Sequence, residues 1–244
     1  MIEIAALQKT YGTFTAVNSI SLTVNPGEIF AFLGVNGAGK TTTIRMLAGI
    51  LKPSSGLIRI GGFDLANAPL EAKRITGYIP DRPYIYSKLT AREFLCFIAD
   101  LYGVERKEAA MRLNTLLEEY TLSAWADELV ENFSHGMKQR LATCAALIHQ
   151  PRVLIVDEPM VGLDPHGARH LKERFRHYAS IGMSVFLSTH SLNVAEEVAD
   201  RLAIIHRGSI IAQGTLAEIK ALAGGKHNGL EDMFMELTAS AYLE

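Results

Sequence analysis

The residues with the clearest chemistry form a glycine-rich run that ends in lysine and threonine, Gly34-Val35-Asn36-Gly37-Ala38-Gly39-Lys40-Thr41. The run fits the pattern GxxxxGK[ST] and lies between an apolar segment at 28–33 and a helix expected to about residue 51. Glycines allow several backbone N–H groups to face one point, and the start of a helix adds partial positive charge there. The lysine can neutralise phosphate charge, and the threonine hydroxyl can bind Mg²⁺. The run therefore predicts a site for a nucleoside triphosphate, rather than an ordinary glycine turn.

Two adjacent carboxylates, Asp157 and Glu158, follow a second apolar segment at 153–156. Parallel α/β sheets place ligands at the carboxyl ends of their strands, so both carboxylates are expected near the triphosphate. Asp157 is expected to hold Mg²⁺ through water, and Glu158 is expected to polarise an attacking water. Alone, such a pair is weak evidence, because a strand can simply end in a solvated turn. Together with the glycine-rich run, the pair predicts a site that hydrolyses the nucleotide.

The elements that must position these residues alternate between strands and helices. Apolar alternation and short apolar runs predict strands at 2–6, 20–24, 28–33, 57–60, 152–156, 184–187 and 201–205, and a further short strand that ends at 78–80. A final hairpin is expected to turn at Gly208, and a short helix is expected at 216–222. Strands separated by helices predict a parallel sheet with helices on its faces.

A helical block interrupts this alternation between about residues 89 and 150. Its first helix opens with a capping box of Thr90 and Glu93. Apolar side chains then recur at helical spacing: Phe94, Phe97, Ile98 and Leu101. Further helices are expected at 111–120 and 137–149, and Ser134 suits the N-cap of the last one.

Composition excludes several classes of protein. The chain has 244 residues, 48% hydrophobic and 20% charged, so it can bury a sizeable core and is too apolar to be disordered. A net charge of −2 lacks the basic excess of a nucleic-acid binder. No apolar run approaches the roughly 18–20 residues of a spanning helix, and the start of the chain lacks a signal-peptide pattern. A cytoplasmic protein is expected, with Cys96 and Cys144 both reduced and buried.

With these motifs in this order, the chain resembles the ATP-binding subunit of ABC transporters along nearly its whole length. Tyr11 matches the aromatic residue that stacks on adenine in this family, and residues 34–41 match the Walker A motif. Residues 134–138 stand at the position of the LSGGQ signature, and residues 154–158 match Walker B with its catalytic glutamate. Residues 162–165 match the D-loop, and residues 188–190 end in the switch histidine. Three segments resemble bacterial exporter ATPases in particular. They are the signature, the segment at 157–165 and the tail at 230–238.

The resemblance implies a fold and a division of the chain. The fold is an α/β P-loop NTPase (RecA-like) core with an antiparallel β subdomain and an inserted α-helical subdomain. The core with its β subdomain is expected at 1–81 and 151–218, the helical signature subdomain at 82–150, and a C-terminal helical tail at 219–244.

The resemblance also implies the roles of individual residues. The catalytic residues are expected to be Glu158, His190 and Lys40. The residues expected to bind ATP are Tyr11, Gly34, Asn36, Gly37, Ala38, Gly39, Lys40, Thr41 and Thr42, with Tyr11 open to the simpler interpretation of a Tyr-Gly turn. The Mg²⁺ ligands are expected to be Thr41, Asp157 and Asp81. Ser134, His135, Gly136 and Met137 are expected to contact ATP held by a second subunit, and Asp164 is expected to shape the interface between subunits.

Two residues depart from the family pattern. Asp81 stands where the family has the glutamine of its Q-loop, which puts the sensing of the membrane partner there in doubt. His135 stands where the signature has a glycine and adds bulk at the expected interface.

The implied partners are a second ATPase subunit, identical or different, in a head-to-tail dimer, and a separate transmembrane permease. No nucleic acid is expected, and the protein is expected on the inner face of the cell membrane. The permease is expected to dock beside residues 81–88. Two interpretations stay open for Tyr84, Ile85 and Tyr86 in this segment, contact with the permease or packing within the chain.

The sequence bears on three alternatives to an exporter ATPase. An importer ATPase stays open. An ABC-type ATPase of nucleic acid or the ribosome is disfavoured, because the sequence has one such domain and no long coiled coil between its two nucleotide motifs. A non-catalytic scaffold is disfavoured because Lys40, Asp157, Glu158 and His190 are all present.

Overall fold

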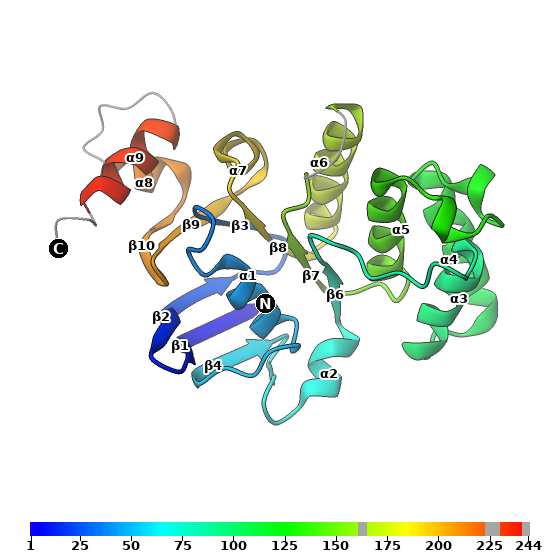
Figure 1. Cartoon of the computed structure of the whole chain (residues 1–244), viewed down its shortest axis with the longest axis horizontal. Coiled ribbons are helices and arrows are strands. Elements are labelled where there is room, and N and C mark those ends of the chain that lie inside the picture. Colours follow the sequence, from blue (N-terminus) through cyan, green and yellow to red (C-terminus); the bar gives the residue numbers. More distant parts are fainter. Residues whose placement is uncertain (161–164, 223–229, 241–244) are drawn as a thin grey trace.

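A six-stranded sheet forms the centre of the computed structural model, which describes residues 1–160, 165–222 and 230–240 (Figure 1). Its strands, in spatial order, are β10 (Ser209–Gly214), β9 (Arg201–His206), β3 (Ile29–Leu33), β8 (Ser184–Thr189), β7 (Val153–Asp157) and β6 (Thr76–Ile79). All neighbours are parallel except the predicted hairpin β9–β10. β3, β7 and β8 are buried at every position, which explains their continuous apolar sequences.

A second, antiparallel sheet contains the strands β2 (Phe14–Val24), β1 (Ile2–Tyr11), β4 (Ser55–Ile60) and β5 (Phe63–Asp64), in that order. The predicted alternation along β1 is wrong at Ala6, which is exposed and has a φ of 47°. A register shift between Ile4 and Leu7 inserts an irregularity there, so Leu7 takes the buried position.

The helices are α1 (Lys40–Leu47), α2 (Pro69–Arg74), α3 (Ala91–Leu101), α4 (Arg106–Glu119), α5 (His135–Leu147), α6 (Pro165–Ser180), α7 (Leu192–Val198), α8 (Leu216–Leu222) and α9 (Leu230–Ser240). Two short 3₁₀ turns, Ser123–Trp125 and Val130–Asn132, lie between α4 and α5. Helices α3, α4 and α5 gather on the side of the molecule away from the antiparallel sheet (Figure 1). The predicted fold class, a parallel α/β core with an antiparallel sheet and inserted helices, is confirmed.

Helix α3 begins at the predicted capping box of Thr90 and Glu93. Its fully buried side chains are Ala91, Phe94, Leu95 and Ala99. The helical spacing is confirmed, and two of the residues that carry it, Phe97 and Leu101, are 40% and 65% exposed. Small alanines allow α3 to approach its neighbours closely, and the two larger side chains are left on the outer face.

Two apolar clusters hold the site in place. One fills the space between the parallel sheet and helices α3 to α7, and the other packs α1 between the two sheets. In the second cluster, the ring of Phe186 lies 5.8 Å from that of Phe30 and 5.6 Å from that of Phe32. The helix that follows the glycine-rich loop is therefore anchored on both sides.

Two further expectations concern single residues and membrane spans. Cys144 is buried as predicted, but the prediction for Cys96 is wrong, because this thiol lies on the exposed face of α3. Among the described residues, no helix combines the length and the apolar character needed to cross a membrane.

Candidate active site

The glycine-rich loop follows β3 at its carboxyl end and leads directly into α1. The side chain of Lys40 is buried, and its Nζ donates to the carbonyls of Gly34 at 2.7 Å and Val35 at 3.3 Å. Gly39 has a φ of 112°, and a Cβ there would lie 2.6 Å from the Ala16 carbonyl oxygen. The loop therefore needs its glycine for close packing as well as for its backbone angles.

Asp157 lies at the carboxyl end of β7, and its side chain is only 2% exposed. The hydroxyl of Ser188, its register partner on β8, donates to Asp157 Oδ1 at 2.5 Å. Burial raises the pKa of Asp157, and hydrogen bonds from Ser188 and Thr41 oppose that rise. Sequence reasoning gave Ser188 no role. The signal was present, since its strand runs parallel to the acidic one and ends beside it.

Glu158 lies between Lys40 and His190. Its Oε1 is 3.5 Å from Lys40 Nζ, and its Oε2 is 2.9 Å from Nδ1 of His190 and accepts from the backbone N–H of His190 at 3.3 Å. The backbone of Glu158 has a φ of 49°, which is unusual for a residue other than glycine and is typical of functional sites. The structure thus brings together the three residues predicted to be catalytic.

A cavity of about 380 Å³ opens in front of the glycine-rich loop. Its lining residues include most of those predicted to bind ATP: Tyr11, Asn36, Gly37, Gly39, Lys40, Thr41 and Thr42, with Asp81 and Glu158. Gly34 and Ala38 lie beneath this lining, where Ala38 is buried. Phe14 also lines the cavity, and sequence reasoning missed it. Its signal was its position, two residues beyond Gly12 in the turn that starts at Tyr11.

The signature residues lie elsewhere on the chain. Ser134 is the N-cap of α5, and its Oγ accepts from the N–H of Met137 at 3.3 Å, which confirms the predicted cap. Ser134, His135 and Gly136 line a separate cavity of about 690 Å³ together with residues of α6. This cavity and the one at the glycine-rich loop have no lining residue in common. Within one chain, the structure therefore does not bring the two sets of residues together.

Asp81 and His135, the two departures from the family pattern, lie close to one another. Both line a cavity of about 450 Å³, together with Arg82, Pro83 and Lys138. Asp81 also lines the cavity at the glycine-rich loop, and His135 also lines the one beside α6. This small cavity is therefore the point at which the two halves of the site approach each other within one chain.

The other predictions made from the sequence have three different outcomes. Asp164 lies outside the residues that the structure describes. Tyr84 and Tyr86 are exposed, as docking residues would be, whereas Ile85 packs against the main apolar cluster. In the described part of the chain, no three His, Cys, Asp or Glu side chains converge as a metal site on their own.

The sequence matches the family model described as ABC transporter over residues 17–161, more than half of the chain. It is 38% identical over 244 residues to linearmycin resistance ATP-binding protein LnrL of Bacillus subtilis (strain 168), covering all of this chain and 76% of that protein. It is 39% identical over 213 residues to Nod factor export ATP-binding protein I of Paraburkholderia xenovorans (strain LB400), covering 87% of this chain and 70% of that protein. A solved structure of an ATP-binding subunit of an ABC transporter superposes with a TM-score of 0.92 at 36% identity, covering 98% of this chain and 99% of that one.

Proposed function

The chain belongs to the ABC transporter family as an ATP-binding subunit, and we propose that two such subunits complete each ATP site between them. Membership makes it an ATPase that serves a transporter. The observation that carries the proposal is the separation of its two half-sites, because the Lys40 cavity and the Ser134 cavity share no lining residue. A head-to-tail pair of chains would place the Ser134 half of one subunit opposite the Lys40 half of the other.

In this proposal the glycine-rich loop holds the triphosphate. Backbone N–H groups at 36–41 and the start of α1 supply partial positive charge, and Lys40 supplies a full one. Lys40 Nζ now donates to two carbonyls of its own loop, so it is already directed toward the space in front of that loop. Gly34 and Ala38 are buried residues of the loop, and Thr42 lines the cavity in front of it.

The oxygen atoms near Thr41 fit Mg²⁺, which prefers hydroxyl, carboxylate and water ligands. The Thr41 hydroxyl and the Asp157 carboxylate are already within hydrogen-bonding contact, and Asp81 lines the same cavity. These three residues would hold the ion directly or through water. When bound, the ion would neutralise charge on the phosphates.

Glu158 is proposed as the base for hydrolysis. A water oxygen attacks the γ-phosphorus, Glu158 takes the proton of that water, and the bond from the γ-phosphorus to the oxygen of the leaving ADP breaks. His190 holds the Glu158 carboxylate through its Nδ1 contact of 2.9 Å and presents the rest of its ring toward the γ-phosphate. The contact between Lys40 and Glu158, 3.5 Å, would be exchanged for contacts of each with the nucleotide.

The Ser134 half is proposed to bind the γ-phosphate held by the other subunit. The Ser134 oxygen accepts from within its own helix, which leaves the hydroxyl hydrogen to donate outward. The N–H groups of His135, Gly136 and Met137 belong to the first turn of α5. The Met137 N–H donates to Ser134, whereas those of His135 and Gly136 have no acceptor within the helix and can face a phosphate. Asp164 would contribute to the same interface between subunits.

The ATPase is proposed to drive a separate transmembrane permease from the inner face of the membrane. The inserted helices at 82–150 would move against the core at 1–81 and 151–218 as the dimer closes. The remaining segment, 219–244, would form the tail, in which α9 packs against α7, α8 and β10. Exposed Tyr84 and Tyr86 suit a docking surface, and the ring of Tyr86 contacts that of Phe97 edge-on at 5.7 Å. The relative named for Nod factor export supports export as the direction.

The decisive experiment uses Glu158→Gln. The variant is expected to bind ATP, to hydrolyse it about 100 to 1,000 times more slowly, and to elute as a dimer in ATP and Mg²⁺. Glu173→Gln, on the exposed surface of α6, is the matched control and is expected to behave as the wild type. Turnover near the wild-type rate would remove Glu158 from its role, and a variant that stays monomeric with ATP would contradict the shared site.

A further inference from the structure

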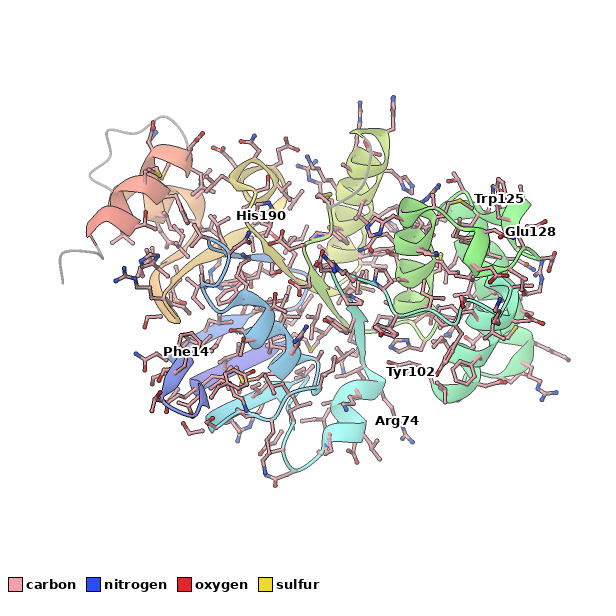
Figure 2. All side chains as sticks on the ribbon, in the orientation of Figure 1. Phe14, Arg74, Tyr102, Trp125, Glu128 and His190 are labelled. Atoms are coloured by element: carbon pink, nitrogen blue, oxygen red, sulfur yellow. The ribbon has the colours of Figure 1, made fainter. Side chains whose placement is uncertain are left out.

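The tip of the β1–β2 hairpin forms the outer wall of the cavity at the glycine-rich loop. Tyr11 and Phe14 face each other directly across the turn at Gly12 and Thr13, so their side chains project from the same face of the sheet. Both line the cavity, and they are 49% and 63% exposed. Figure 2 labels Phe14 on this hairpin. Two aromatic rings are therefore available at one end of the nucleotide cavity.

A third residue, Lys9, covers the Tyr11 ring. Its Nζ lies 5.2 Å from the centre of the ring, within the range of a cation–π contact. The same Nζ donates to the carbonyl of Lys52 at 2.8 Å, which ties the hairpin to the segment that follows α1. Lys9 is not among the residues that line the cavity, so its ammonium group covers the ring from outside. The other face of Tyr11 is left for a ligand.

The lining of the cavity divides by chemistry. Lys40, Thr41 and Glu158 gather at the loop end and suit a triphosphate with its metal ion. Tyr11 and Phe14, with the small Ala16, offer π surfaces and no charge at the hairpin end. Stacking of this kind recognises the face of a base and does not read its hydrogen-bonding edge.

We propose that Lys9 and Phe14 act with Tyr11, the residue that the family resemblance already assigns to base stacking, as one clamp on the nucleobase. The base stacks on the free face of Tyr11, and Phe14 limits its movement at the open edge of the cavity. Lys9 is a positioning residue, because it holds the Tyr11 ring without touching the nucleotide. The inference rests on the proposed ATP site and adds two residues, Lys9 and Phe14, that determine how tightly the base is held.

The test compares ATP with inorganic tripolyphosphate, which carries the phosphates without the base, by titration calorimetry on the full chain with Mg²⁺. Phe14→Ala is expected to weaken ATP binding about fivefold to a hundredfold and to leave tripolyphosphate binding unchanged. GTP is expected to lose affinity by the same factor as ATP, since stacking does not read the edge of the base. Phe63→Ala, in the same sheet but outside the cavity, is the matched control.

Lys9→Ala is expected to raise the KM for ATP about two- to fivefold with kcat unchanged, and Lys9→Arg is expected to restore it, because arginine also forms a cation–π contact. Equal losses for ATP and tripolyphosphate, or no loss in Phe14→Ala and Lys9→Ala, would overturn the clamp while leaving the ATP site intact. A wild-type chain that binds neither probe would overturn the proposed ATP site, and the clamp with it.

Discussion

The two halves of the proposed ATP site are built in opposite ways. In the glycine-rich half, Lys40 and Asp157 are buried, and each is held by groups from a neighbouring element. In the signature half, Ser134 and His135 are exposed at the start of one helix, and the Ser134 hydroxyl accepts the capping hydrogen bond from Met137 N–H of the same helix. The first half is preorganised by the sheet, whereas the second is presented at the surface for another molecule.

The difference follows from the elements that carry each half. Parallel strands end at one edge of the sheet, so residues far apart in sequence, such as Glu158 and His190, meet there without any partner. The first turn of a helix leaves backbone N–H groups exposed to a ligand. The helix alone does not fix the distance between these groups and the other residues of the site. One chain can therefore preorganise the residues for hydrolysis, but a second chain is needed to complete the proposed ATP site.

The largest predicted effect tests this division directly, with one variant in each half. Lys40→Ala removes the cation of the buried half, and Gly136→Asp places a carboxylate in the first turn of α5, where it suits the helix but repels phosphate. Each variant alone is expected to lose about 100-fold in ATPase rate. An equal mixture is expected to recover about a quarter of the wild-type rate, because half of the dimers then contain one intact site out of two.

The mixture has its own control. The ATPase rate of each variant alone, at the same total concentration, gives the background rate. Nucleotide titration then distinguishes the two half-sites, because Lys40→Ala is expected to weaken ATP binding to the single chain and Gly136→Asp is not. A mixture that stays at the background rate would mean that the two half-sites do not meet across subunits.

The second prediction concerns how tightly each half is packed. A Cβ on Gly34 would lie 2.6 Å from the Ile205 carbonyl oxygen and 2.8 Å from its Cγ2. Gly34→Ala is therefore expected to destabilise the fold by about 1–3 kcal/mol. Gly136→Ala, inside the first turn of α5, is expected to leave stability unchanged or raise it by up to about 1 kcal/mol. Urea unfolding of both variants measures the contrast, and equal effects would show that the two halves are packed alike.

The sequence predicted the preorganised half better than the exposed one. Motif spacing and apolar strands were enough to place Lys40, Asp157 and Glu158 together, because the topology of a parallel sheet leaves few alternatives. Helical spacing did not show which face α3 buries, since Phe97 and Leu101 are larger and more apolar than the alanines that pack inward. Which face a helix turns inward depends on the shape of its neighbours, and a single sequence does not contain that shape.

The same limit applies to residues that act through a partner on another element. The positions of Ser188 and Phe14 in the sequence were a signal, but their contacts with Asp157 and Tyr11 follow only from the strand register and the hairpin pairing. Whether Ser134 meets a phosphate depends on a second molecule, so neither the sequence nor the fold of one chain decides it.

The smallest predicted effect concerns the joint between the core and the inserted helices. The ring of His149, just beyond α5, stacks on Tyr102 at the end of α3, with 3.7 Å between ring centres. Its Nε2 lies 3.2 Å from the Thr76 carbonyl oxygen at the start of β6. Figure 2 labels Tyr102 between the core and the inserted helices. Burial lowers the pKa of His149 to about 4, so the folded chain holds it neutral where an unfolded chain would protonate it.

Stability should therefore fall as the pH falls from about 6.5, the pKa of histidine in an unfolded chain, toward about 4, because only the unfolded state gains the proton in that window. At pH 5 the loss from this residue is expected to be about 1–2 kcal/mol relative to pH 7.5. His149→Phe keeps an aromatic ring on Tyr102 but cannot titrate, so its free energy of unfolding should change less between these pH values, measured by urea unfolding. The exposed His177→Phe serves as the control and should keep the wild-type slope. If His149→Phe also keeps that slope, the joint does not depend on a neutral His149, and the core and the inserted helices are held together by their apolar contacts alone.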